Sequence, residues 1–129
     1  MPEGHTIRRL ARDLERDLAG HVIAATSPQG RFADGAAAID GARCTGSDAA
    51  GKHLFVSFDD DQVLYIHLGL IGKFRRYRAS TERGGTVRLR LVQPTWAWDL
   101  TGPQTCRLVS PLEADEIAEL APDLPQEVI

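Results

Sequence analysis

Residues 52–68 read KHLFVSFDDDQVLYIHL, and this stretch decides the fold. Its first part alternates, so that Leu54, Val56 and Phe58 fall on one face of a strand. Three consecutive aspartates at 59–61 favour a turn, and a second apolar run follows over 63–68. Two such runs joined by a short polar turn predict a β-hairpin.

Segments of strand character recur on both sides of this hairpin, with Gly, Pro and Asp turns between them. We expect further strands over 21–27, 39–44, 73–78, 86–92, 95–100 and 105–109, with a polar loop from Pro28 through Asp34. Many short strands at regular spacing with few helices indicate a β-sandwich or barrel. The predicted fold is α+β: a two-layer antiparallel β-sandwich flanked by an N-terminal and a C-terminal helix.

The two helices are predicted from different signals. Near the N-terminus, apolar residues follow the i, i+3, i+4, i+7 spacing of an amphipathic helix that ends near Gly20: Ile7, Leu10, Ala11, Leu14 and Leu18. Near the C-terminus, Pro111 opens a second helix, because proline suits the first helical position. We expect Ile117 and Leu120 to be the inner residues of that helix.

Length and composition bound the class of protein. A chain of 129 residues with 43% hydrophobic and 26% charged residues is typical of a single globular domain. We expect the domain to span residues 1–120, with 121–129 as the start of a linker. Cys44 and Cys106 are far apart and have no metal-binding spacing, so we expect buried thiols in a reducing compartment. No apolar run is long enough for a membrane helix, so we expect neither membrane spanning nor membrane contact.

Charge is distributed unevenly along the chain. Residues 111–129 contain six acidic and no basic residues, whereas 1–110 contain 15 basic and 12 acidic residues, a net charge of +3. Seven basic residues fall within 73–90: Lys73, Arg75, Arg76, Arg78, Arg83, Arg88 and Arg90. Such a basic segment suits contact with phosphates, and a solvated strand face is the equal alternative.

The N-terminus carries the first candidate for chemistry. Removal of Met1 would leave Pro2 with a free secondary amine beside the carboxylate of Glu3. An amine nucleophile next to a carboxylate is the beginning of a Schiff-base site, and a free α-amino group has a pKa of about 7.7–8.0. A proline in the first turn of a helix is the structural alternative.

Two internal motifs are also candidates. Lys52 enters the hairpin between Gly51 and His53, either as a solvated lysine or as a catalytic residue, a cation over a phosphate or an activated base. Leu70 lies between glycines in the segment 67–72, HLGLIG, where a loop normally carries polar residues. It is either a wedge between bases, as in proteins that kink DNA, or part of a tight turn folded back into the core.

Together these stretches resemble the N-terminal domain of the formamidopyrimidine-DNA glycosylase/endonuclease VIII (Fpg/Nei) family, and within it the Nei-like actinobacterial branch. The resemblance rests on these motifs: Pro2–Thr6, Pro28–Ala33, Gly51–Phe55, His67–Leu70, Leu100–Pro103 and Leu120–Leu124. It implies a bifunctional DNA glycosylase/AP lyase of base excision repair, whose partner is double-stranded DNA with oxidised or abasic sites. We expect a monomer, and the resemblance implies a cytoplasmic bacterial protein associated with the nucleoid.

The resemblance also implies roles for individual residues. Pro2 matches the nucleophile that attacks C1′, Glu3 the acid/base at the sugar ring oxygen, and Lys52 the lysine that contacts the phosphate beside the lesion. Leu70 matches the residue that fills the gap left by the everted nucleotide. We further expect DNA contacts from four residues of the matching motifs and the basic segment: His67, Lys73, Arg75 and Arg31.

Departures from the family pattern limit these expectations. The formamidopyrimidine branch has an Arg and a Phe that help to fill the gap, and residues 101–107 contain no such pair. The family's helix-two-turn-helix and zinc finger do not occur in these residues, so no cofactor or metal is expected in this chain. A retained Met1 would turn the Pro2 amine into an amide. The competing hypothesis is therefore a non-catalytic damaged-DNA-binding module or an inactive truncated fragment.

Overall fold

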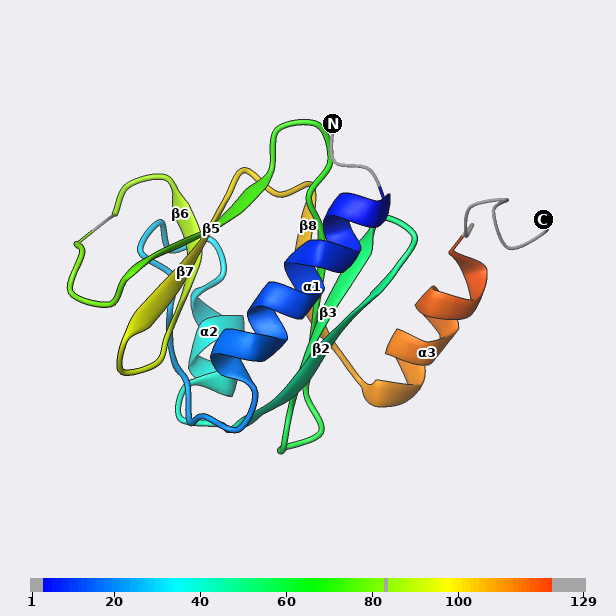
Figure 1. Cartoon of the computed structure of the whole chain (residues 1–129), viewed down its shortest axis with the longest axis horizontal. Coiled ribbons are helices and arrows are strands. Elements are labelled where there is room, and N and C mark those ends of the chain that lie inside the picture. The colour runs from blue at the N-terminus through cyan, green and yellow to red at the C-terminus, as the bar shows by residue number, and fades with distance from the viewer. Residues whose placement is uncertain (1–3, 83, 122–129) are drawn as a thin grey trace.

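The computed structural model describes residues 4–82 and 84–121 (Figure 1). Helices and strands follow in the order α1 (Gly4–Leu18), β1 (Ala24–Thr26), α2 (Ala33–Ile39), β2 (Cys44–Ala50), β3 (His53–Phe58), β4 (Val63–His67), β5 (Lys73–Arg78), β6 (Val87–Val92), β7 (Trp96–Thr101), β8 (Thr105–Val109) and α3 (Pro111–Leu120). The strands form two four-stranded antiparallel sheets, ordered β1-β6-β7-β5 and β2-β3-β4-β8. This arrangement confirms the predicted α+β sandwich.

The predicted hairpin is formed by β3 and β4, and its register decides which side chains face the core. Leu54 pairs with Ile66 and Val56 with Leu64, and all four side chains are fully buried between the sheets. The alternating partners point the other way, so that Phe55 lies opposite Tyr65 on the outer face. A one-residue shift would exchange these two faces, which is why the apolar alternation specifies the register so strongly.

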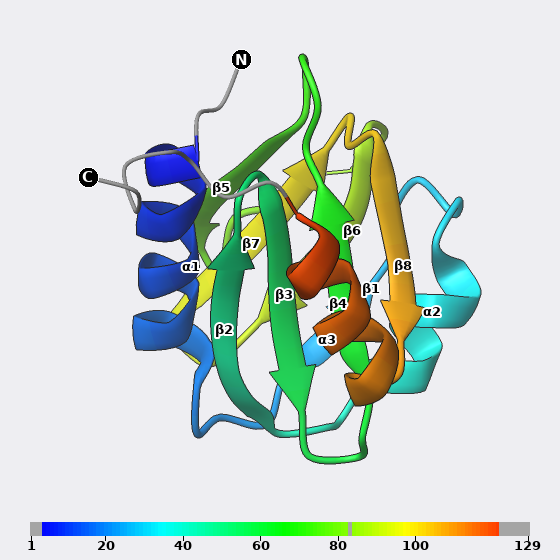
Figure 2. The same ribbon diagram turned by 90° about the vertical axis from the view of Figure 1, so that its right-hand side faces the viewer.

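Helix α1 closes the side of the sandwich between the edge strands β2 and β5 (Figure 2). Its apolar side chains are buried against both sheets, as the sequence spacing predicts: Ile7, Ala11, Leu14 and Leu18. Asp17 is also buried, and its carboxylate accepts a hydrogen bond of 2.8 Å from Trp98 Nε1 on β7. Its backbone carbonyl accepts another from Gln93 Nε2 at 3.0 Å, so the last turn of α1 is tied to the β1-β6-β7-β5 sheet.

Helix α3 covers the outer face of the other sheet (Figure 2). Ser110 caps it by accepting a hydrogen bond from the Glu113 amide, and Pro111 occupies the first turn as predicted. Ala114 is buried against β4 and β8, and Ile117 packs beside it. The expectation for Leu120 is wrong, because its side chain is 85% exposed. Six residues after Ala114, it lies about 120° around the helix from that buried side chain.

Two predicted boundaries between β1 and β3 are also wrong. Residues 33–39 form α2 instead of a loop, and 39–44 contain a turn at Gly41 instead of a strand. Glycine has a low helix propensity, so Gly35 weakens the sequence signal for this helix. In the structure the Phe32 ring occupies the space that a Cβ at Gly35 would need. The strand β2 lacks an apolar alternation. It is an edge strand held by β3 and by Glu15 of α1, whose carboxylate accepts the Ser47 amide at 3.0 Å.

Candidate nucleic-acid interface

The loop between β4 and β5 presents two apolar side chains to solvent. Leu70 is 73% exposed and Ile71 is 75% exposed, so the alternative in which this turn folds back into the core is wrong. The turn depends on its glycines, since Gly69 has a φ of 71° and Gly72 packs directly against the Leu68 backbone. The backbone therefore holds an apolar tip away from the core. This loop, residues 69–72, is named the wedge loop.

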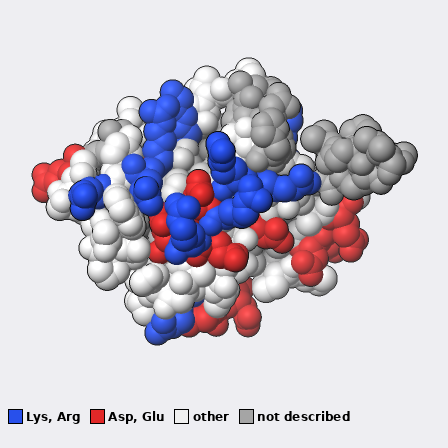
Figure 3. Space-filling model, in the orientation of Figure 1, with Lys and Arg blue, Asp and Glu red and all other residues white. Residues whose placement is uncertain are grey.

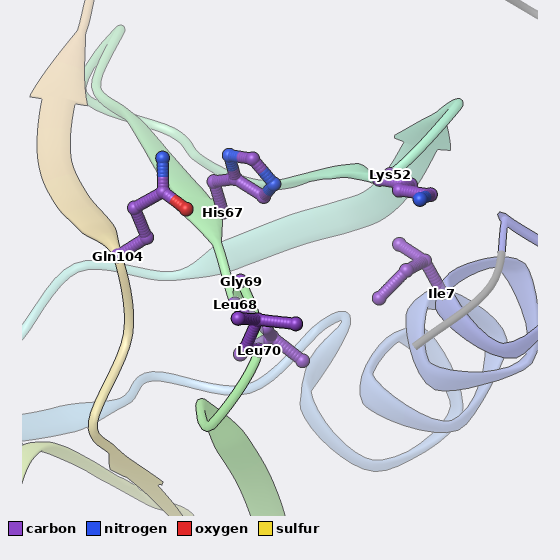
Figure 4. Close-up of a pocket in the computed structure, with 7 residues that line it drawn as sticks. All are labelled: Ile7, Lys52, His67, Leu68, Gly69, Leu70 and Gln104. Carbon is purple, nitrogen blue, oxygen red and sulfur yellow. The ribbon is translucent and has the colours of Figure 1, made fainter. Parts of the chain in front are cut away.

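A pocket of about 210 Å³ lies at the base of this tip (Figure 4). It is bordered by α1, the β2–β3 turn, the end of β4, the wedge loop and the β7–β8 loop, through Ile7, Lys52, His67, Leu68, Gly69, Leu70 and Gln104. Lys52, His67 and Leu70 are therefore brought together from separate segments, as the resemblance implies for a common site.

Lys52 owes its position to a tight hairpin turn. Ala50 pairs with His53, so only Gly51 and Lys52 connect β2 to β3, and Gly51 adopts a φ of 58°. A positive φ at the first turn residue suits the twist of a two-residue hairpin and favours glycine there. Lys52 is exposed at the tip and borders the pocket across from the wedge loop (Figure 4).

Sequence reasoning missed the row of side chains behind His67. His53 and His67 are paired across β3 and β4, and their ring centroids lie 5.2 Å apart. Tyr65 Oη lies 2.6 Å from His53 Nδ1, at hydrogen-bond distance. Burial, followed by the nearby His67, lowers the pKa of His53, and burial raises the pKa of Tyr65. The hairpin register, which places 53 opposite 67 and 55 opposite 65, is the signal that would have found this row.

Gln104 is the second residue that sequence reasoning missed. Its backbone amide donates to the carbonyls of His67 at 2.9 Å and Leu68 at 3.3 Å, so the β7–β8 loop is attached to the end of β4. Its side chain packs directly on Gly69. A Cβ added at Gly69 would come within 3.0 Å of the Gln104 side chain. No sequence signal separates this glutamine from an ordinary loop residue.

The basic residues are divided by the fold into different environments. Lys73 and Arg75 are exposed on β5, immediately after the wedge loop. Arg90 is buried instead, and both oxygens of Asp99 accept hydrogen bonds of 3.0 Å from its guanidinium. It therefore does not belong to a solvated basic face. Arg31 is exposed in the loop before α2 and does not border the pocket. Figure 3 shows Lys and Arg gathered over α1 and β5, with acidic side chains over α3.

The expected nucleophile and acid/base, Pro2 and Glu3, lie outside the described residues. Helix α1 begins at Gly4 and borders the pocket through Ile7. Within the described ranges, no three His, Cys, Asp or Glu side chains are arranged to hold a metal ion. Burial raises the pKa of Cys44 to about 11 and that of Cys106 to about 12, so both are thiols at neutral pH. None of the described helices is long and apolar enough to cross a membrane.

Comparisons with known proteins identify the family of the chain. Residues 1–107 match the family model described as formamidopyrimidine-DNA glycosylase N-terminal domain. The chain is 43% identical to Endonuclease 8 1 of Mycobacterium tuberculosis (strain ATCC 25618 / H37Rv) over 129 residues, which cover 95% of this chain and 48% of the relative. It is 28% identical to the formamidopyrimidine-DNA glycosylase of Corynebacterium urealyticum over 100 residues, 70% of this chain and 35% of that relative. The chain thus spans about half the length of the first relative and about a third of the second.

Solved structures share the fold. MutM in complex with DNA containing carbocyclic 8-oxo-G superposes with a TM-score of 0.76 at 22% identity, over 90% of this chain and 48% of that one. The Lactococcus lactis formamidopyrimidine-DNA glycosylase, bound non-covalently to DNA containing an AP site, gives the same TM-score at 20% identity and the same coverage.

Proposed function

The chain belongs to the formamidopyrimidine-DNA glycosylase family, and we propose that it is the catalytic N-terminal half of a bifunctional DNA glycosylase/AP lyase that removes oxidised bases from DNA. The observation that carries this proposal is the pocket where Lys52, His67 and Leu70 meet beside the start of α1. A cation, an imidazole and an exposed apolar tip around one hollow suit a phosphate and a nucleotide gap at the same place.

The proposed chemistry requires the Pro2 amine to be free. The neutral amine attacks C1′ of the everted nucleotide, and the bond from C1′ to the base breaks, so that the base leaves with a proton. Glu3 protonates the sugar ring oxygen, and the opened sugar forms an iminium ion with Pro2. The iminium withdraws electrons and acidifies the 2′ proton. Loss of that proton expels the 3′ phosphate by β-elimination, which cuts the strand.

Lys52 and His67 hold the phosphate beside the lesion in this proposal. Both border the pocket from the ends of β3 and β4, strands whose inner side chains are packed in the core. A site mounted on packed strands keeps the backbone of these residues in place before DNA binds. The neighbouring His53 is hydrogen-bonded to Tyr65 and has no assigned DNA contact in this proposal.

Leu70 supplies the wedge, and Ile71 belongs to the same tip. Eversion of a nucleotide costs a few kcal/mol of stacking and pairing energy. Two exposed apolar side chains lose their unfavourable contact with water when they enter the vacated space, which offsets part of that cost. The wedge loop therefore stabilises the everted state without a base-specific contact.

The test is covalent trapping with borohydride on DNA that contains an abasic site. Intact mass spectrometry first establishes that Met1 has been removed, because an N-terminal Met abolishes the nucleophile. We expect the wild-type chain to form an adduct that peptide mapping places on the Pro2 nitrogen. Lys52→Ala should still form this adduct, at a lower rate, because lysine serves the phosphate and not C1′.

Two outcomes would contradict the proposal. Trapping of Pro2→Gly at the wild-type rate with the adduct on a lysine would remove Pro2 from the chemistry. Binding to abasic DNA with no adduct from the Met1-free chain would support the competing module that binds damaged DNA without turnover.

A further inference from the structure

A second hollow runs between α1 and the edge strand β5 and is separate from the pocket at the wedge loop. This hollow, of about 500 Å³, is named the α1–β5 groove. Its basic side chains come from both walls, Arg9 from α1 and Lys73, Arg75 and Arg76 from β5. Its apolar lining includes Leu10, Phe74 and Trp98, and Asp13 contributes the one carboxylate among the lining residues.

The two hollows are continuous at one residue. Leu68 lines the pocket that contains Lys52 and also lines the α1–β5 groove. A strand held at the pocket can therefore continue into the groove without crossing the acidic α3, which covers the far sheet face (Figure 1). Figure 3 shows the basic side chains as two bands, over β5 and over α1, with white and some acidic atoms between them.

One cation of the groove is held in place before any ligand binds. Arg76 has its guanidinium carbon 4.0 Å from the ring centroid of Trp96, and its Nη1 lies 3.5 Å from the buried carboxylate of Asp17. Stacking on the indole and pairing with the carboxylate restrict the side chain, so less conformational entropy is lost when it meets a phosphate. Asp17 also accepts a hydrogen bond from Trp98, so its carboxylate has a second partner besides Arg76.

Protection of a sheet edge explains only part of this pattern. β5 ends the order β1-β6-β7-β5, and lysines and arginines on an edge strand prevent pairing with other chains. That function accounts for Lys73 and Arg75, which lie on the strand itself. It does not account for Arg9, which comes from a helix and lines the same hollow.

We propose that the α1–β5 groove binds the sugar-phosphate backbone of the damaged strand on one side of the lesion, with Arg9 and Arg75 contacting phosphates from opposite walls. This inference rests on the proposed function, because the pocket at the wedge loop sets where the lesion lies. Convergence of cations from two elements suits a chain of phosphates, and the apolar floor suits the sugars between them.

The experiment compares Arg9→Gln and Arg75→Gln with Arg12→Gln. Arg12 is a matched control, since it is exposed on the same helix but lines the hollow on the opposite side, against β2. Fluorescence anisotropy measures the affinities for single-stranded oligonucleotides with one abasic-site analogue. The salt concentration is varied between about 25 and 200 mM, where phosphate contacts dominate the affinity. The oligonucleotides carry long flanks on both sides, or a short flank on the 5′ or the 3′ side.

The slope of log K against log salt is negative. We expect each groove variant to make it about 0.7 less negative, the value for one phosphate contact on a single strand. Wild-type affinity should fall when one particular flank is shortened and not the other, and the groove variants should be insensitive to that shortening. Arg12→Gln should retain the asymmetry between the two flanks.

The inference would be overturned if both flanks contributed equally in the wild type, or if Arg12→Gln lost as much affinity as the groove variants. Either result would mean that the groove cations act only through the general charge of the molecule. Borohydride trapping of the wild-type chain, run alongside, separates this failure from failure of the proposed function. A chain that traps normally but shows no flank asymmetry has the catalytic site without the groove contact.

Discussion

At the scale of single residues, Leu70 and Arg90 show how position in the fold reverses an ordinary preference. Leu70 is apolar and lies in solvent, held there by a glycine turn. Arg90 is charged and lies in the interior, paired with Asp99 and donating to the carbonyl of Ala79 at 3.2 Å. What distinguishes Leu70 from a singly exposed leucine is that Ile71 is exposed beside it and that both lie at the edge of a pocket, and this combination points to contact with another molecule.

Leu70→Ala is expected to weaken binding to a duplex that contains an abasic-site analogue by roughly 5- to 30-fold, because loss of most of a leucine's buried surface costs about 1–2 kcal/mol. Binding to the matching single strand should change little, since that strand leaves no gap to fill. Anisotropy titrations of both substrates make the comparison. Leu112→Ala, an equally exposed leucine on α3, is the control and should affect neither substrate. A similar loss on the single strand would exclude a wedge.

His53 should make the stability of the domain depend on pH. Its pKa is lowered in the folded state by burial and by His67, while the unfolded state keeps the ordinary value of about 6.5. The unfolded state then binds the proton more readily, so this contribution is present above pH 6.5 and is lost as the pH falls below it. Urea unfolding between pH 7.5 and 5.5 measures the effect.

His53→Gln should reduce that pH dependence, because glutamine does not titrate and can still accept the Tyr65 hydroxyl. His21→Gln, at an exposed position after α1, is the control and should show the same pH dependence of stability as the wild type. An identical pH dependence in wild type and His53→Gln would assign the effect to other groups.

At the scale of elements, α1 links the pocket to the β1-β6-β7-β5 sheet: its first turns border the pocket and its last turn is anchored in that sheet. The anchor is Asp17, an acidic residue near a helix C-terminus, where the helix dipole disfavours a negative charge. The hydrogen bond from Trp98 and the nearby Arg76 guanidinium compensate for this. Such a carboxylate fixes the direction of the helix that carries the N-terminal residues.

Asp17→Ala is expected to lower the free energy of unfolding by about 2–3 kcal/mol, since it leaves the buried Trp98 N–H without its acceptor. Asp13→Ala serves as the control, because Asp13 pairs with the exposed Arg16 at 3.3 Å and such pairs contribute at most about 1 kcal/mol. Urea denaturation of both variants gives the difference. Equal destabilisation would show that the helix surface, and not the anchor, is responsible.

At the scale of the whole molecule, basic side chains gather on the side that carries the site, with some acidic side chains of α1 among them. Basic side chains lie over α1 and β5, next to the pocket, and the acidic residues of α3 lie over the other sheet (Figure 3). The chain has a net charge of −3, and its basic side chains nevertheless gather on one face, which suits DNA. About half the length of the Mycobacterium relative has no counterpart in these 129 residues, so the DNA contacts available here are a fraction of those open to a longer chain.

We expect this 129-residue chain to bind DNA weakly and with strong salt dependence, with a slope of log K against log salt of roughly −3 for about four phosphate contacts. Excision of an oxidised pyrimidine from a duplex should be slow or undetectable, because eversion costs a few kcal/mol that these contacts do not supply. Cleavage at a pre-formed abasic site should persist once Met1 is removed. Turnover on the two duplexes at low salt distinguishes these cases, and efficient excision of the oxidised base would contradict the expectation.

The sequence by itself determined the sandwich, the two terminal helices, the central hairpin and the residue types at the candidate site. It could do so because alternation and helical spacing are local signals, and because the motifs around Lys52 and Leu70 are contiguous. Only the tertiary structure decided that Lys52, His67, Gln104 and Leu70 surround one pocket, that Leu70 points outward and that Arg90 is buried. It also revealed α2 and β2, which lack a local pattern and exist because Phe32 packs on Gly35 and Glu15 binds Ser47. Apart from the Phe32–Gly35 contact, these outcomes depend on contacts between residues distant in sequence, which no local pattern encodes.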